Sequence, residues 1–259
     1  MLKHIIRKLH HLCYMVSIAI CFLPLYPALY YYSRKHNLRA MNRIRKMFSF
    51  GSAFLSGIFF KFSFEKPIDW SKPYIICPNH TSNLDITSMV LLMKNDFVFF
   101  GKAELLDNIV TRLYFKTIDI PVKRESKMSA FRAFKRAEDY LKRGTSVVIF
   151  PEGLIADAYP PVLQPFKNGP FRMAIEQKIN IIPVTIRNNW KIMWDDGSKY
   201  GTRPGTCDIR VHKPIETSHL SLDDADHLRD QVYAIIHQEL NEYQAIEYMQ
   251  IVQEKIHLN

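Results

Sequence analysis

An imidazole and a carboxylate lie five residues apart in the segment Asn79-His80-Thr81-Ser82-Asn83-Leu84-Asp85. His80 is in the loop after an apolar run, and Asp85 falls in the first turn of the helix expected next. Asp85 can therefore turn back and accept a hydrogen bond from one imidazole nitrogen. This contact would fix the tautomer, leave the other nitrogen available as a base and stabilise the imidazolium. The same residues also fit a simple helix start, in which Ser82 and Asp85 form the cap and His80 is a surface histidine.

A second carboxylate follows another apolar run, in Phe150-Pro151-Glu152-Gly153. If the two apolar runs are parallel strands, Glu152 lies at the same edge of the sheet as His80, where α/β proteins usually bind ligands. Taken alone, Pro-Glu-Gly is equally well an ordinary turn with a solvated glutamate. The two segments together are a much stronger indication of a site than either one alone.

Several common kinds of catalytic site have no counterpart in the sequence. There is no G-x-S-x-G nucleophile elbow, no G-x4-G-K-[ST] phosphate loop and no G-x-G-x-x-G dinucleotide fingerprint. The chain has only nine glycines, which disfavours a glycine-cradled nucleotide. The four cysteines lack the spacing of a zinc site and are too few for a disulfide scaffold, so we expect a reduced cytosolic environment.

The elements that must position these residues alternate between strand and helix from Glu65 onward. Apolar runs predict strands at 73–77, 97–100, 118–122, 146–150, 181–186 and 207–212. Helical periodicity predicts helices at 84–93, 126–143 and 171–178, and a long C-terminal helix that opens with a capping box at Ser221 and Asp224. This alternation predicts an α/β domain over residues 65–259, with a mostly parallel sheet flanked by helices.

The N-terminal quarter differs in charge from the rest of the chain. The net charge is +10, and residues 1–64 contain ten Lys or Arg and no Asp or Glu. The uncharged stretch Leu12–Ser33 would measure roughly 33 Å as one helix, about one bilayer core, although Pro24 and Pro27 predict a break near Leu23. A second apolar run, 47–60, is too short to span a bilayer. We interpret residues 1–64 as a helical membrane-associating segment.

The charge pattern bears on how this segment meets the membrane. Basic residues flank the first apolar run on both sides, so they give no clear orientation for a single pass. A segment that dips into one leaflet, with its basic residues on anionic headgroups, satisfies both the prolines and the charge symmetry. This favours monotopic attachment over a single pass, with the α/β domain on the cytoplasmic face. Basic residues interleaved with long apolar runs suit lipid better than nucleic acid, which we do not expect as a partner.

Together these motifs resemble those of a known family. His-x4-Asp within NHTSNLD, followed about 70 residues later by FPEG, resembles the glycerolipid acyltransferases that include 1-acylglycerol-3-phosphate acyltransferase. Further segments fall in the family's order, at residues 101–105 (GKAEL), 122–124 (VKR), 166–172 (FKNGPFR), 182–184 (IPV) and 203–205 (RPG). The resemblance covers roughly residues 73–216.

The resemblance implies an enzyme that moves a fatty acyl group from acyl-CoA or acyl-carrier protein to the free hydroxyl of a lysophospholipid. The expected acceptor is 1-acylglycerol-3-phosphate and the expected product phosphatidic acid. His80 would be the general base and Asp85 its partner, with no metal or bound cofactor. The expected partners are membrane lipids, the lysophospholipid and the acyl donor. The implied substrate-binding residues are Glu152, Gly153, Lys102, Arg124 and Lys167.

Two departures from the family pattern leave the acceptor open. The family usually has Thr-Arg after FPEG, with an arginine thought to meet the acceptor phosphate, whereas this chain has Leu154-Ile155. The chain also lacks the Gly and Pro usual between G-K-x-E-L and the next arginine. One alternative is therefore the same chemistry on another acceptor, such as lyso-ornithine lipid. The other is a non-catalytic membrane-binding protein on the same fold.

Overall fold

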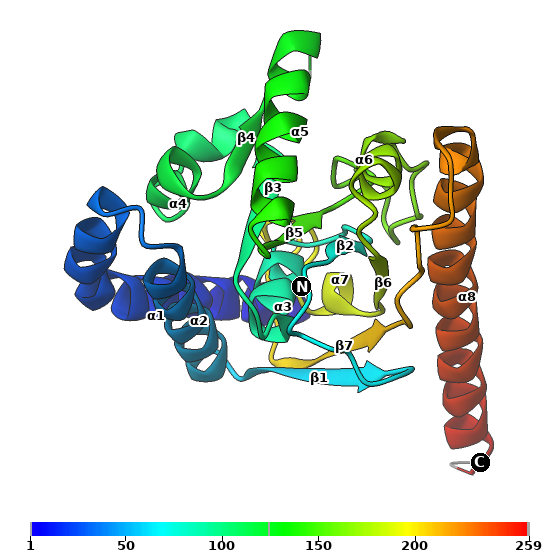
Figure 1. Ribbon diagram of the computed structural model, residues 1–259. Coiled ribbons are helices and arrows are strands. Elements are labelled where there is room, and N and C mark those ends of the chain that lie inside the picture. The colour runs from blue at the N-terminus through cyan, green and yellow to red at the C-terminus, as the bar shows by residue number, and fades with distance from the viewer. Residues whose placement is uncertain (1, 124, 258–259) are drawn as a thin grey trace.

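A central β-sheet with helices on both faces organises the protein in the computed structural model, which describes residues 2–123 and 125–257 (Figure 1). Within these residues the strands are β1 (Ile58–Phe64), β2 (Ile75–Pro78), β3 (Phe97–Lys102), β4 (Ile120–Val122), β5 (Ser146–Ile149), β6 (Ile181–Ile186) and β7 (Gly205–Val211). The α-helices are α1 (Leu2–Arg34), α2 (Leu38–Leu55), α3 (Leu84–Leu92), α4 (Arg112–Thr117), α5 (Lys127–Lys142), α6 (Gly169–Gln177), α7 (Asn189–Ile192) and α8 (Ala225–His257). Short 3₁₀ helices cover Ala103–Leu106 and Leu222–Asp224.

The sheet has the strand order β1-β7-β6-β2-β5-β3-β4. Neighbouring strands are parallel except for β6 and β7, which are antiparallel. Strands β2, β5 and β6 are buried along their whole length, as expected for parallel strands that are covered on both faces. The prediction of an α/β fold with a mostly parallel sheet flanked by helices is confirmed.

Alternate residues of the central strands pack into two separate cores. Ile76 of β2 lies in a core with residues of α1, α2 and α3, whereas its neighbours Ile75 and Cys77 lie in a core with residues of α5, α6 and α8. This alternation is the two-residue period of a strand. Both faces of the central strands are thus screened from water.

Residues close in the chain cap α5 and α8. The Ser126 side chain accepts a 3.2 Å hydrogen bond from the Ser129 N–H at the start of α5. Gly144, with φ of 78°, follows the end of that helix. Before α8, Ser221 and Asp224 form the reciprocal contacts of a capping box. Local hydrogen bonds therefore set these boundaries, and the predicted capping box at Ser221 and Asp224 is confirmed.

The predicted break near Leu23 is wrong, because α1 is one helix that contains Pro24 and Pro27. Each proline removes one backbone donor from the helix. Phe22 and Leu29, on either side of the prolines, are buried in one cluster with residues of α2 and α4. This tertiary packing keeps the chain helical through both prolines.

The second apolar run is only partly helical. Helix α2 ends at Leu55, and Ile58–Phe64, predicted as part of a helical segment, instead form β1, which pairs with β7 along its full length. Aromatic residues repeat at every second position of this strand, a composition that suits a half-buried pleated surface. The short helices α4 and α7 were not predicted, because four to six residues carry too little helical periodicity. The division of the chain after residue 64 stays a prediction.

A buried ion pair attaches α2 to the α/β domain. Nη2 of Arg45 lies 3.1 and 2.9 Å from the two carboxylate oxygens of Asp119. Arg45 is 5% exposed and Asp119 is 2% exposed. The rings of Phe97, Phe99 and Tyr114 lie around the guanidinium. One of the ten N-terminal cations therefore faces the protein interior instead of a lipid headgroup.

Candidate active site

Neighbouring parallel strands bring His80 and Glu152 to the same edge of the sheet. Strands β2 and β5 pair with Ile76 opposite Val148, and each of the two polar residues lies four positions further along its chain. The His80 backbone N–H donates a 2.6 Å hydrogen bond to Oε1 of Glu152. This edge, at the carboxyl ends of the parallel strands, is the usual place for ligands in α/β sheets.

The imidazole of His80 meets the carboxylate of Asp85, as the spacing predicted. Nδ1 of His80 lies 3.0 Å from Oδ2 of Asp85. The Asp85 side chain is completely buried, whereas 15% of the His80 side chain is exposed. A carboxylate at Nδ1 holds the ring proton there and leaves Nε2 as the nitrogen that can accept a proton.

Asp85 also binds the backbone that leads into α3. Its Oδ2 accepts hydrogen bonds from the backbone N–H groups of Thr81 and Ser82, at 2.6 and 2.8 Å. The hydroxyl oxygen of Ser82 accepts a 3.1 Å hydrogen bond from the Leu84 N–H. One side chain therefore holds the backbone before α3 and also contacts the His80 ring.

Two residues of FPEG hold the ring and the backbone of His80. The Phe150 ring stacks on the imidazole, with ring centroids 4.0 Å apart and planes at 23°. Glu152 is buried, and its Oε2 accepts a 2.8 Å hydrogen bond from the Gln164 N–H. Glu152 therefore joins the His80 loop to the proline-rich segment that follows β5. Its contact with His80 is through the main chain, which suits a residue that organises the site.

Glu152 titrates far from the usual range of a glutamate. Burial raises its pKa to about 7, because desolvation disfavours the charged form. Hydrogen bonds from the Gln164 and His80 N–H groups act in the opposite direction, and the negative charge of Asp85 adds to the increase. Near neutral pH, both protonation states of Glu152 are therefore populated.

The two lysines implied in substrate binding lie on different segments near the sheet edge. Lys102 is the exposed last residue of β3, whose carboxyl end lies beside that of β5. A Cβ added to Gly153 would lie 3.0 Å from Nζ of Lys167, so the Lys167 ammonium group is next to the FPEG turn. Gly153 has φ of 73°, a conformation that favours glycine. Arg124 lies outside the described residues.

Two buried asparagines belong to the site, although no pattern in the sequence assigned them a role. The Asn79 side chain exchanges two hydrogen bonds with the backbone of Ile186 in β6, at 3.1 and 2.7 Å. Asn189, the first residue of α7, donates from Nδ2 to Oδ1 of Asp85 at 2.9 Å. Asn189 and Asp85 are 104 residues apart in the chain, so no local spacing could indicate this contact.

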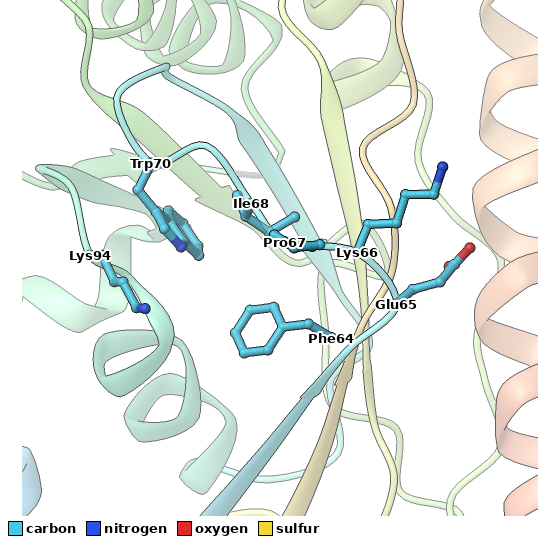
Figure 2. Close-up of a pocket in the computed structure, with 7 residues that line it drawn as sticks. All are labelled: Phe64, Glu65, Lys66, Pro67, Ile68, Trp70 and Lys94. Atoms are coloured by element: carbon cyan, nitrogen blue, oxygen red, sulfur yellow. The ribbon is translucent and has the colours of Figure 1, made fainter.

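An open groove of about 350 Å³ is separate from this site (Figure 2). Phe64, Ile68 and Trp70 line it from the end of β1 and the loop that follows, and Lys94 lines it from beyond the end of α3. Asp85 lies at the start of α3, so that helix separates the groove from the His80–Asp85 pair. The groove is therefore not part of the candidate active site.

Comparisons with known proteins point to one family. The family model described as Acyltransferase matches residues 59–187, about half of the chain. A 1-acyl-sn-glycerol-3-phosphate acyltransferase alpha from Mus musculus is 28% identical over 165 residues, which cover 62% of this chain and 56% of that protein. A chloroplastic 1-acyl-sn-glycerol-3-phosphate acyltransferase from Arabidopsis thaliana is 31% identical over 147 residues, which cover 56% of this chain and 40% of that protein. The chain thus spans about half the length of the curated relatives it matches.

One solved structure has a similar fold. The crystal structure of the 1-acyl-sn-glycerophosphate (LPA) acyltransferase PlsC from Thermotoga maritima aligns with a TM-score of 0.74, covering 93% of this chain and 98% of that chain. The sequence identity is 19%, so this likeness concerns the fold alone. The family model, the named relatives and the ordered motifs agree with one another. This chain belongs to the glycerolipid acyltransferase family, the family of the 1-acyl-sn-glycerol-3-phosphate acyltransferases.

Proposed function

We propose that this protein transfers a fatty acyl group from an acyl thioester to the free hydroxyl of a lysophospholipid. The donor is acyl-CoA or acyl-carrier protein, the acceptor is 1-acylglycerol-3-phosphate and the product is phosphatidic acid. The observation that carries this proposal is the 3.0 Å contact between Nδ1 of His80 and Oδ2 of Asp85 at the carboxyl edge of the sheet. The activity named for the curated relatives supports the choice of acceptor.

His80 acts in this scheme as a general base through Nε2, because Nδ1 is held by Asp85. It removes the proton of the acceptor hydroxyl as that oxygen attacks the thioester carbonyl. The C–O bond forms, the C–S bond breaks when the tetrahedral intermediate collapses, and the imidazolium returns its proton to the leaving thiolate. A positioned base contributes on the order of 10² to 10⁴ in rate, so orientation and oxyanion stabilisation supply the rest. The thioester is already activated, so the scheme needs no metal or bound cofactor.

Lys102 and Lys167 are assigned to the acceptor phosphate. Both are exposed, and lysine binds phosphate well as a point charge. They would take the place of the arginine that the family usually has where this chain has Ile155. The same departure is the observation that favours a second acceptor, lyso-ornithine lipid, with unchanged chemistry at His80.

The protein is proposed to reach its lipid substrates through α1 and α2. Among the described residues, α1 is the one helix long and apolar enough to cross a membrane. Helix α1 also exposes a stripe of apolar side chains at helical spacing, and α2 exposes a shorter apolar stripe. The exposed residues are Leu2, Ile5, Leu9, Leu12, Val16, Ile20 and Leu23 in α1, and Met47, Phe50 and Phe54 in α2.

Contacts at both ends of α1 support a helix that lies on the membrane. Near its N-terminus, Nδ1 of His10 lies 2.5 Å from Oγ1 of Thr202 in the α/β domain. Towards its C-terminus, Leu29 is buried in one cluster with Tyr114 of α4. A helix that packs on the same domain at both ends keeps both ends on one side of the bilayer. We therefore propose monotopic attachment to the cytoplasmic face.

Acyl transfer by isolated membranes tests the proposed function. Membranes that carry the protein are incubated with labelled acyl-CoA or acyl-carrier protein and, separately, with 1-acylglycerol-3-phosphate or lyso-ornithine lipid. We expect wild-type protein to label phosphatidic acid. We also expect His80→Ala to abolish transfer and Asp85→Asn to lower it by about 10² to 10⁴, with both variants folded and membrane-bound.

Each other outcome has a defined meaning. Labelling of ornithine lipid alone would keep the chemistry and replace the acceptor. Undiminished transfer by His80→Ala would remove this residue from the mechanism. Transfer to neither acceptor, with either donor, would contradict the proposed function.

A further inference from the structure

The Asp85 carboxylate has one partner from a distant part of the chain. Nδ2 of Asn189 lies 2.9 Å from Oδ1 of Asp85 and 2.9 Å from Oγ of Ser88. All three residues have no exposed surface. The contact therefore joins the start of α7 to the first turns of α3 in a place that water does not reach.

The two oxygens of Asp85 have different surroundings. Oδ2 faces the His80 ring and accepts two backbone N–H groups. Among the described residues, Asn189 is the one hydrogen-bond donor to Oδ1. Burying a carboxylate oxygen without a hydrogen-bond donor costs free energy. Removing a donor from a buried carboxylate therefore favours the protonated carboxyl group. The Asn189 amide thus holds Oδ1 while Oδ2 faces the His80 ring.

The orientation of the Asn189 amide follows from its partners. The Ser88 hydroxyl donates its hydrogen to the Leu84 carbonyl at 3.0 Å, so its oxygen meets Asn189 as an acceptor. The ionised Asp85 carboxylate offers only acceptor oxygens. Both neighbours therefore require the NH₂ end of the amide, and neither could be satisfied by its oxygen.

The turn that carries Asn189 is itself held in place. Asn79 binds the backbone of Ile186 at the end of β6. The Asn188 side chain accepts from the Asp208 N–H at 2.7 Å and donates to the Thr206 carbonyl at 3.0 Å, both in β7. The amide of Asn189 is therefore presented to Asp85 from a backbone anchored to two strands.

We propose that Asn189 is a positioning residue for the His80–Asp85 pair, an inference that rests on the proposed function. Its amide holds the Asp85 carboxylate turned so that Oδ2 faces the imidazole. Asn189 acts through Asp85 and not on the reacting atoms. Without this amide the pair binds a proton more readily, and His80 is available as a base only at higher pH.

Three other titratable groups face the pair. Glu152 contacts the His80 N–H. Asp195 exchanges backbone hydrogen bonds with Thr81 and Asn83. The negative charge of Asp85 contributes to the raised pKa of the buried Cys207 thiol in β7. None of the three contacts Asn189 by a hydrogen bond in the described part of the chain, so their contributions to a pH profile are common to all variants of that residue.

Kinetics of Asn189→Ala and Asn189→Asp test the proposal, with Ser88→Ala as the matched control. The control removes the other acceptor of the same amide and leaves its contact with Asp85. We expect Asn189→Ala to lower kcat on the order of ten- to a hundredfold, with little change in KM for donor or acceptor. The acid limb of its pH–rate profile should move to higher pH. Asn189→Asp is nearly equal in volume, and once the new carboxyl group ionises it should move the acid limb of the pH–rate profile in the same direction. Ser88→Ala should leave the acid limb in place.

A second measurement does not depend on turnover. Diethylpyrocarbonate modifies neutral imidazoles, so peptide mass spectrometry of the His80 peptide across pH reports where this ring becomes protonated. Labelling should fall off at higher pH in Asn189→Ala than in wild type and in Ser88→Ala. Because this readout needs no acceptor, a wild-type protein that transfers no acyl group would contradict the proposed function without deciding the role of Asn189.

The proposal is overturned if Asn189→Ala and Ser88→Ala show the same loss of kcat with unshifted pH profiles and unshifted His80 labelling. That result would give Asn189 a packing role alone. If Asn189→Ala does not fold, the isosteric Asn189→Asp decides the question by the same two measurements.

Discussion

Glu152 accepts a 2.6 Å hydrogen bond from the backbone N–H of His80 and so joins the FPEG turn to the loop that carries the imidazole. The contact is made to the main chain, whereas the ring itself is held by Asp85 at 3.0 Å. Two carboxylates at the same sheet edge thus have different tasks. Glu152 determines where the His80 backbone lies, and Asp85 determines which ring nitrogen is free.

The buried Glu152 should make stability depend on pH. Its pKa is about 7 in the folded protein against 4.5 for the ordinary group. Folding therefore favours the protonated form of Glu152. The protonated side chain contributes its full stability below about pH 4.5, and this contribution is lost as the pH rises through about 7. The free energy of unfolding of wild type relative to Glu152→Gln should fall by at most ~3 kcal/mol over this range and then level off.

Thermal unfolding of wild type and Glu152→Gln between about pH 4.5 and 8.5 measures this difference. Glu176→Gln, at an exposed position of α6, is the control and should keep a constant difference from wild type. A constant difference for Glu152→Gln as well would show that this carboxyl does not change its protonation state in that range.

The two lysines at the site edge should act on acceptor binding. Lys102→Met and Lys167→Met each remove one cation from the proposed phosphate site. KM for 1-acylglycerol-3-phosphate should rise on the order of tenfold in each variant, while kcat and the KM for the acyl donor change little. Steady-state kinetics on membranes measures both. Lys142→Met, at the exposed end of α5, should have no effect, and equal effects of all three variants would argue against a phosphate site at Lys102 and Lys167.

The buried ion pair between α2 and the α/β domain should matter for stability. Arg45→Met leaves the Asp119 carboxylate buried without its counter-charge, which typically costs about 3–5 kcal/mol. Adding Asp119→Asn should recover much of this loss, because the amide oxygen can still accept the Phe99 N–H that Asp119 accepts at 2.9 Å.

Chemical unfolding of the single and double variants gives these free energies. The exposed pair between Arg39 and Asp96, with 71% of the Arg39 side chain exposed, is the control, and Arg39→Met should cost less than about 1 kcal/mol. A loss for Arg45→Met as small as that for Arg39→Met would mean that the buried pair does not anchor α2.

The exposed apolar stripe of α1 should determine membrane binding. Leu12 and Val16 are 59% and 49% exposed, so replacing both by glutamate should preserve folding and weaken insertion into the headgroup layer. Centrifugation of lysates should then show the protein in the soluble fraction. Met128 and Phe131 of α5 are similarly exposed, at 59% and 65%, and the same double replacement there should leave the protein membrane-bound. Firm retention of the α1 variant would contradict attachment through this stripe.

The local features of this protein could be predicted from its sequence. His80 and Asp85 are five residues apart at a helix start, so their contact depends mainly on the geometry of one turn. The apolar runs of β5 and β6 and the caps of α5 and α8 are likewise formed by residues close in the chain. The order of the motifs also indicated the family before the fold was known.

Only the tertiary structure decided the features that depend on distant contacts. The continuity of α1 through Pro24 and Pro27 comes from packing against α2 and α4, and Arg45 turns inward because Asp119 lies buried across from it. Asn189 reaches Asp85 across 104 residues of chain. Periodicity and capping are set by neighbours a few residues apart, so the sequence by itself determined strands β2 to β7, the starts of α3 and α5, the capping box before α8 and the His80–Asp85 pair. Burial and partner choice are properties of the packed chain, so they became definite only when the sheet brought separate segments together.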